Sequence, residues 1–131
     1  MNRYVVVVTG SRHWTDVDAI RARLIEYPSG STVLFHGECP YGGADEIADR
    51  LGRAGGLDVR ARPALKGETF PQRNTRMVAE AAALARETGA EFVCEAFPLL
   101  GSRGTWDTVN KFRRECDEGV TVTEVANAEQ P

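Results

Sequence analysis

The sequence predicts an α/β protein: a doubly wound, Rossmann-like parallel sheet of about five strands with helices on both faces. Apolar strand-like segments alternate with segments of helical periodicity along the chain, which is typical of a parallel sheet connected by crossover helices. The first strand, residues 4–8, is a continuous run of tyrosine and valines, as expected of a central strand buried on both faces. Right-handed crossovers leave few other topologies.

Local signals place the individual elements. Thr15 or Asp16 can cap the N–H groups of a first helix, which Pro28 and the residues after it end. Pro71 is well placed to start a long helix, and Gly89 ends that helix. The predicted strands are residues 4–8, 33–36, 57–61, 91–97 and 120–125, and the predicted helices are residues 17–27, 44–54, 71–88 and one from the 101–107 turn to about residue 116.

Length and composition indicate one ordinary globular domain. We expect the domain to cover residues 1–125 of the 131 and the tail, residues 126–131, to be frayed. Apolar residues make up 42% and charged residues 27% of the chain, which are usual values. The net charge of −3 argues against binding nucleic acid through a basic surface.

The chain carries no signal for membranes, metals or export. No apolar run approaches the length of a membrane helix, and no signal peptide is recognised. The three cysteines are an odd number without the paired spacing of a metal site. We therefore expect a cytoplasmic protein without a metal, a cofactor or a membrane partner.

The segment GSRGTWD, residues 101–107, is the strongest indication of a binding site. It follows an apolar strand and opens the last helix, whose free N–H groups point into the turn. Gly104 lets a ligand approach the backbone, and Ser102 and Thr105 offer hydroxyl groups. Such a turn is typical of an anion site, most often one for phosphate.

Two further side chains of this segment have alternative roles. Asp107 either caps the helix or acts on a bound substrate. Trp106 either stacks on a base or packs inside the protein, and we favour packing because aromatic residues more often fill space.

A second glycine-bearing turn follows the first strand. Gly10 allows a tight exit from the strand, Ser11 can donate to a phosphate or hydroxyl, and Arg12 can pair with an anion. An ordinary loop with a solvated arginine fits the same residues. The position favours ligand binding, because ligands of such sheets bind at the carboxyl ends of the strands.

A third turn precedes the helix at residues 44–54. Gly42 and Gly43 favour close approach of the backbone to an anion. Asp45 lies in the first helical turn, where it either complements the helix dipole or accepts a hydrogen bond from a ribose hydroxyl. Three such turns at one edge of the sheet predict one nucleotide-sized pocket.

Arg73 and Asn74 lie near the start of the helix at residues 71–88. A cation at this end is disfavoured by the helix dipole, so Arg73 is a candidate for binding an anionic ligand. The alternative is a surface arginine that pairs with Glu68 or Asp45. We expect neither Arg73 nor Thr105 to belong to the core.

Four segments together resemble the SLOG superfamily, and most closely its YspA-like, YpsA-related small proteins. They are VTGSRHWTD, HGECPYGGADEIAD, RNTRMV and AFPLLGSRGTWDTV. The resemblance extends from about residue 4 to residue 122. It implies a Rossmann-like fold that binds nucleotides or nucleotide-derived ligands, as in the LOG phosphoribohydrolases and in sensor domains without obvious catalysis.

The resemblance also assigns roles to residues. It places the first turn near the ribose or base and the third turn on the opposite wall, and it matches residues 101–105 to a phosphate-binding turn. LOG enzymes carry a catalytic glutamate at the position that Thr108 occupies here. The implied ligand-binding residues are Gly10, Ser11, Arg12, Gly42, Gly43, Asp45, Arg73, Asn74, Ser102, Gly104 and Thr105.

The sequence thus predicts a protein that binds a small nucleotide-type ligand, either as a sensor or by sequestration. The alternative is a LOG-like phosphoribohydrolase that cleaves an N-glycosidic bond, with Arg73 clamping the phosphate and Asp107 stabilising the oxocarbenium ion. A third possibility, binding of single-stranded DNA, is disfavoured by the acidic pI of about 5.4.

The helix at residues 71–88 also predicts self-association as a dimer. Its apolar residues form one stripe with Met77, Ala81 and Leu84 and a second stripe beside it. Because one stripe suffices to cover a sheet, the second implies another packing partner. The alternative is that the helix is buried within the monomer.

Overall fold

The computed structural model describes residues 2–124, which form one five-stranded, entirely parallel sheet and four helices. The strand order β3-β2-β1-β4-β5 is that of a doubly wound, Rossmann-like fold, so the predicted fold class is confirmed. The strands are β1 (Tyr4–Gly10), β2 (Thr32–His36), β3 (Asp58–Ala61), β4 (Glu91–Phe97) and β5 (Val120–Val122), and the helices are α1 (Val17–Leu24), α2 (Ala44–Ala54), α3 (Phe70–Thr88) and α4 (Arg103–Glu115).

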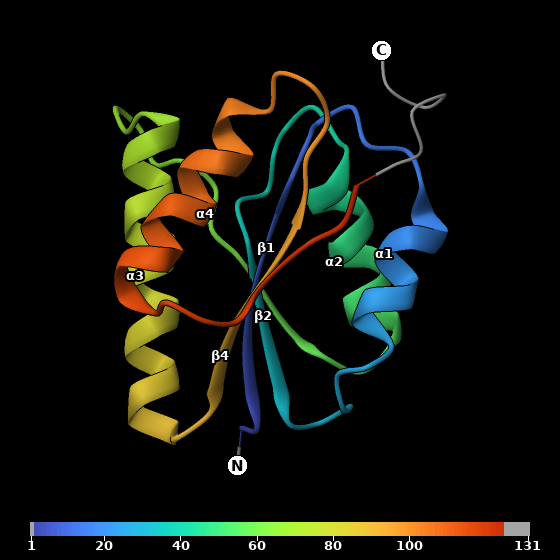
Figure 1. Ribbon diagram of the computed structural model, residues 1–131, viewed down its shortest axis with the longest axis vertical. Helices are drawn as coiled ribbons and strands as arrows, with labels where there is room; N and C mark the ends of the chain where they lie inside the picture. Colours follow the sequence, from blue (N-terminus) through green and yellow to red (C-terminus); the bar gives the residue numbers. More distant parts are fainter. Residues whose placement is uncertain (1, 125–131) are drawn as a thin grey trace.

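The helices form one layer on each face of the sheet, with α1 and α2 on one face and α3 and α4 on the other (Figure 1). The valines of β1 alternate between the two resulting cores. Val6 and Val8 pack with residues of α1 and α2, whereas Val5 and Val7 pack with residues of α3 and α4. The continuous apolar run in the sequence therefore reflects a central strand that is buried on both faces.

Helix boundaries agree with the sequence prediction for α2 and differ elsewhere by a few residues. Helix α3 begins at Phe70 rather than Pro71 because Thr69 caps it: the Thr69 hydroxyl accepts from the backbone N–H of Gln72 at 3.2 Å, and the Gln72 side chain accepts from the Thr69 N–H at 2.9 Å. Helix α1 ends at Leu24, three residues earlier than predicted. Strand β5 ends at Val122, and residues 125–131, including the predicted tail, lie outside the described residues.

The apolar residues of α3 are used inside the monomer. The second stripe that predicted a dimer contains Val78 and Ala82, and each is only 2% exposed in the single chain. Met77 and Ala81 pack in the core beneath the helix, and Leu84 packs against that core. The helix therefore leaves no unused apolar stripe, and the argument for self-association drawn from it is wrong.

A buried carboxylate connects α1 to the sheet. Glu95 of β4 is 1% exposed, yet both of its oxygens are paired. Arg23 donates to Oε1 at 2.8 Å and to Oε2 at 2.9 Å, and the Tyr27 hydroxyl donates to Oε2 at 2.5 Å. Burial and the hydrogen bond to Glu95 raise the pKa of Tyr27 well above its ordinary value. The pairing ties α1 and the residues that follow it to β4.

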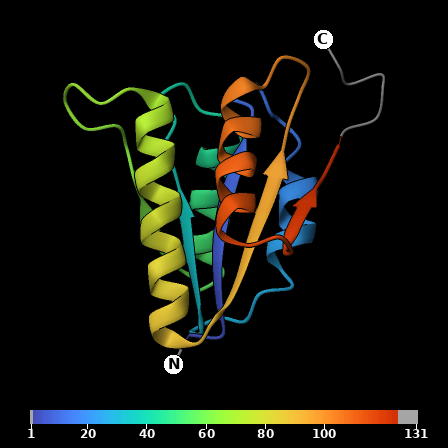
Figure 2. The ribbon, with the colours of Figure 1, turned by 60° about the vertical axis from the view of Figure 1, so that its left-hand side comes forward.

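The strand order also fixes where a ligand can bind. Strand β1 lies between β2 and β4, and the connections that follow β1 and β4 lead to helices on opposite faces of the sheet. Such a switch point opens a crevice at the carboxyl ends of the two strands. Figure 2 shows that α3 and α4 begin at this same end of the molecule, the end to which β4 points.

Candidate ligand pocket at the carboxyl end of the sheet

A cavity of about 440 Å³ lies at the switch point. Its volume is within the range of small-molecule sites, about 300–1,000 Å³. The cavity is formed by the end of β1, the loop after β2, the start of α3 and the turn that opens α4. Its lining residues are Val8, Thr9, Gly10, Ser11, Arg12, His13, Gly37, Cys39, Tyr41, Asp45, Phe70, Arg73, Asn74, Met77, Leu100, Gly101, Ser102, Arg103, Gly104, Thr105 and Thr108.

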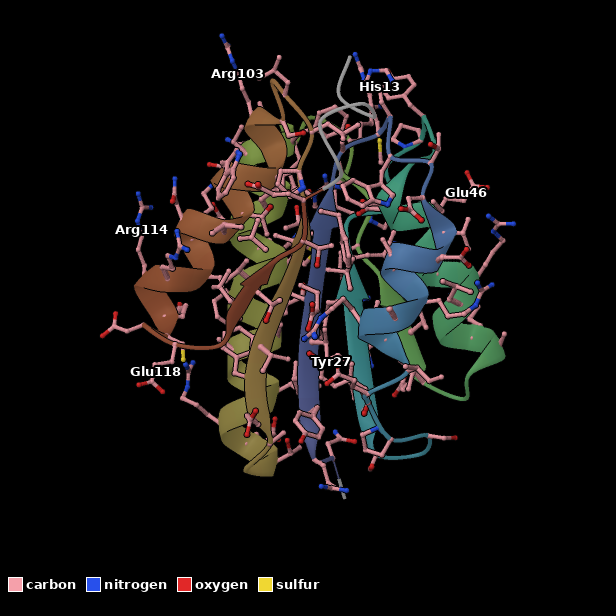
Figure 3. All side chains as sticks on the ribbon, turned by 45° about the vertical axis from the view of Figure 1, so that its right-hand side comes forward. His13, Tyr27, Glu46, Arg103, Arg114 and Glu118 are labelled. Atoms are coloured by element: carbon pink, nitrogen blue, oxygen red, sulfur yellow. The ribbon has the colours of Figure 1, made fainter. Side chains whose placement is uncertain are left out.

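Most of the predicted binding residues come together around this cavity. Gly42, Gly43 and Asp107 are the exceptions and do not line it. Arg12 and Arg103 lie at its rim with exposed side chains. His13 and Arg103 lie at the same end of the molecule (Figure 3). Most of the predicted residues therefore meet at one cavity, but the three turns contribute to it in different ways.

The glycines after β1 and β2 serve chain packing. A Cβ on Gly43 would lie 2.4 Å from the Arg12 Cα, and one on Gly10 would lie 2.4 Å from the Ala44 Cβ. The Ser11 carbonyl accepts from the Ala44 N–H at 3.0 Å, which ties the first turn to the start of α2. Gly43 was expected to let a ligand approach the backbone, but the Arg12 backbone occupies the space beside it.

Asp45, in the first turn of α2, holds the loop that follows β2. Asp45 is 7% exposed, and its Oδ2 accepts from the Cys39 N–H at 3.2 Å. Burial raises the pKa of Asp45, although His36, the Cys39 N–H and Arg73 act in the opposite direction. The carboxylate lines the cavity while it also holds the loop in place.

The turn that opens α4 leaves hydrogen-bond donors free. Ser102 precedes the helix, but its hydroxyl accepts from the Leu99 N–H at 2.9 Å instead of capping. The Arg103 N–H donates to Gly101 and the Trp106 N–H to Ser102, whereas the N–H groups of Gly104 and Thr105 have no acceptor among residues 2–124.

The four helix starts differ in how they are capped. Helices α1 and α3 are capped by the side chains of Asp16 and Thr69, whereas α2, like α4, has no side-chain cap. A Cβ added at Gly104 would meet nothing within 4 Å. The start of α4 is therefore accessible, positively polarised and without an internal partner, which is the arrangement that binds anions.

Arg73 is a buried cation without a carboxylate partner. Its side chain is 8% exposed and donates to the carbonyl oxygens of Gly37 and, at 3.3 Å, Arg62, and to the Asn74 Oδ1 at 2.9 Å. Within residues 2–124 it forms no ion pair, and Asp45 influences it only at longer range. Burial lowers the pKa of Arg73.

The predicted alternative for Arg73, pairing with Glu68 or Asp45, is therefore wrong. Glu68 instead pairs with Arg76 at 2.9 Å, and this hydrogen bond lowers the pKa of Glu68 to about 2. Arg73 and Thr105, at 8% and 3% exposure, are also more buried than predicted.

Asp107 lies on the far side of α4's first turn. Its Oδ2 accepts from the Asn74 Nδ2 at 3.0 Å and from the Lys111 Nζ at 2.8 Å. Partial burial raises the pKa of Asp107, but these hydrogen bonds outweigh it and the net shift is downward. The prediction that Asp107 caps the helix is wrong because Ser102 occupies that position, and Thr108 faces the cavity instead.

Sequence reasoning missed the apolar part of the cavity. Tyr41, Phe70 and Leu100 line it while being 65%, 49% and 78% exposed. Trp106, which we expected to pack inside the protein, is 37% exposed. The sequence did carry a signal for this apolar part, because large apolar residues lie next to the glycine-bearing turns.

Comparison with known protein families and with characterised proteins gives no match. No helix within residues 2–124 combines the length and the apolar character needed to cross a membrane. The described residues contain no group of three or more His, Cys, Asp or Glu side chains placed to hold a metal ion.

Proposed function

We propose that this protein binds a phosphorylated, nucleotide-type ligand in the cavity at the switch point. The observation that carries the proposal is Arg73, a buried guanidinium in the cavity wall that has only neutral acceptors. A buried charge is costly unless it is paired. A phosphate group would supply the missing negative charge.

The turn that opens α4 supports the same ligand. The N–H groups of Gly104 and Thr105 are free to donate to phosphate oxygens, and the Thr105 hydroxyl lines the same cavity. Arg12 and Arg103 add positive charge at the rim. Arg73 and the α4 turn, which both line the cavity, would thus provide donors for one anion.

The size and the apolar rim favour a nucleotide over inorganic phosphate. A cavity of about 440 Å³ is much larger than a phosphate ion needs. The exposed rings of Tyr41 and Phe70 offer surfaces on which a base can stack, and both are approached by arginines, with Arg12 at 5.2 Å and Arg73 at 5.4 Å from the ring centres. The resemblance of four segments to SLOG proteins favours the same class of ligand.

The arrangement favours binding without hydrolysis. A LOG-like phosphoribohydrolase needs a carboxylate beside the sugar, but Thr108 occupies that position and Asp107 is held outside the cavity by Asn74 and Lys111. Asp45 is the carboxylate among the cavity-lining residues, and it accepts a hydrogen bond from the backbone of the loop before its helix. We therefore propose a sensor or sequestering role.

The direct test is the melting temperature in the presence of nucleotides. AMP and ADP-ribose are expected to raise it, since a ligand that binds only the folded state stabilises that state by RT ln(1 + [L]/Kd). Adenosine is expected to raise it much less because it leaves Arg73 and the α4 turn without an anion. If millimolar AMP, ADP-ribose and other nucleoside phosphates leave the melting temperature unchanged, the proposal is wrong.

Replacing Thr105 with valine is expected to weaken AMP binding about 5- to 150-fold, which corresponds to about 1–3 kcal/mol for a hydrogen bond to a charged group. Valine keeps the shape of the buried side chain and removes only the hydroxyl. Thr88→Val is the matched control, because Thr88 bonds to Leu84 at the far end of α3. Calorimetric titration that gives equal AMP affinities for Thr105→Val and Thr88→Val would place the phosphate elsewhere.

A further inference from the structure

A second groove adjoins the cavity on the other side of the α4 turn. Its volume is about 750 Å³. The groove and the cavity share Phe70, Asn74 and residues 101–104, so they are continuous across the turn. Pro71, Trp106, Asp107 and Asn110 line only the outer groove.

Exposed apolar side chains gather around these two hollows. Six large apolar residues are exposed in the described chain, and four of them line one or both hollows: Tyr41, Phe70, Leu100 and Trp106. Ile25 and Leu65 line neither. The outer groove has Phe70 and Trp106 in its walls. Apolar surface concentrated at one place on a protein of this size indicates a contact site.

The outer groove also offers hydrogen-bonding groups suited to the edge of a base. Asn110 is exposed there, and an amide side chain both donates and accepts. Asp107 is fixed by two hydrogen bonds that both use Oδ2, which leaves Oδ1 as an acceptor. Aromatic walls and amide or carboxylate groups together are the means by which proteins hold a nucleobase.

From this continuity we propose that the outer groove is a second ring-binding subsite, and that the ligand is a dinucleoside phosphate with one base in each hollow. Its phosphates would cross the turn between them, where Gly104 and Thr105 present their free N–H groups. The inference rests on the proposed function, since it takes the α4 turn as the phosphate site. It adds that the ligand is a dinucleoside phosphate and that Trp106 stacks on one of its bases.

The test compares affinities for AMP, ADP-ribose, diadenosine diphosphate and diadenosine triphosphate by calorimetric titration. A diadenosine ligand is expected to bind wild-type protein roughly 5- to 150-fold more tightly than AMP, the range for stacking of one base on an aromatic side chain. In Trp106→Ala the ratio of the two affinities is expected to fall to near one, and in Asn110→Ala it is expected to fall partly. Ile25→Ala, at a residue 77% exposed and remote from both hollows, should keep the wild-type ratio.

Tryptophan fluorescence gives an independent reading. The chain has two tryptophans, and Trp14 is buried against Phe97 while Trp106 is exposed in the groove. Diadenosine ligands are expected to quench the emission of Trp106 more strongly than AMP does, and Trp106→Phe should abolish the difference.

The other possible results distinguish a failure of the second subsite from a failure of the proposed function. Equal affinity of wild-type protein for AMP and both diadenosine ligands would overturn the second subsite while leaving the proposed function intact. A gain with ADP-ribose as large as that with diadenosine, and unchanged in Trp106→Ala, would show that the groove holds a sugar and not a base. Absence of binding by all four compounds would refute both the subsite and the function.

Discussion

The Gly43→Ala variant is expected to lose roughly 2–6 kcal/mol of its free energy of unfolding, the sum of backbone strain and overpacking. Gly43 has φ 83° and ψ −147°, a conformation that residues with a side chain rarely adopt. The added Cβ would also lie 2.4 Å from the Arg12 Cα and from the Ser11 carbonyl oxygen. Both contacts are with backbone, so relief requires movement of the turn that lines the cavity. Urea denaturation measures the loss.

The Gly67→Ala variant separates the backbone strain from the overpacking. Gly67 has nearly the same φ, 82°, but a Cβ there would meet nothing within 4 Å. This variant is expected to lose only the strain, about 1–3 kcal/mol, and to bind AMP as the wild type does. Equal losses for the two variants would show that the first turn does not pack against α2 as tightly as the structure indicates.

Replacing Arg23 with methionine is expected to lower the free energy of unfolding by about 3–5 kcal/mol, as for other buried ion pairs that lose one partner. Glu95 would remain 1% exposed with only the Tyr27 hydroxyl as a donor. A buried carboxylate that loses its partner is costly because it is neither solvated nor neutralised. Urea denaturation of the variant and the wild type measures the loss.

Two variants control for the lost charge and the lost packing. Adding Glu95→Gln to Arg23→Met removes the buried charge and keeps an acceptor for Tyr27, so much of the stability should return. Arg21→Met makes the same substitution in the same helix, but Arg21 and Asp18 form an exposed pair, and the expected loss is below about 1 kcal/mol. If Arg23→Met is no more harmful than Arg21→Met, the Glu95 pairing does not hold α1 in place.

The fold could be predicted because the local sequence signals agree with the strands and helices of the structure. The valines of β1 signal a strand buried on both faces, and Gly55 and Gly89 mark helix ends at which the structure also stops. The pairing of Glu95 with Arg23 and Tyr27 could not be predicted in this way. Glu95 belongs to β4 and is distant in the sequence from both residues, and no local pattern reports such a pairing.

The position of the site could be predicted from the sequence, whereas the role of each glycine in it could not. Turns after parallel strands meet at one edge of the sheet, so residues such as Ser11, Arg73 and Thr105 were expected to share a pocket. A glycine pattern alone does not say whether a ligand or another turn occupies the space beside it. Gly43 faces the Arg12 backbone, whereas Gly104 faces open space.

The central claim is that the α4 turn and Arg73 hold a phosphate, and mapping of AMP binding by ¹⁵N–¹H NMR tests it most directly. The largest shifts on titration with AMP are expected at the backbone amides of Gly104 and Thr105 and at the Nε–H of Arg73, and adenosine is expected to produce much smaller shifts at these three groups. Binding of AMP that leaves all three unmoved and instead shifts amides of α1 or of the β3 edge would contradict it.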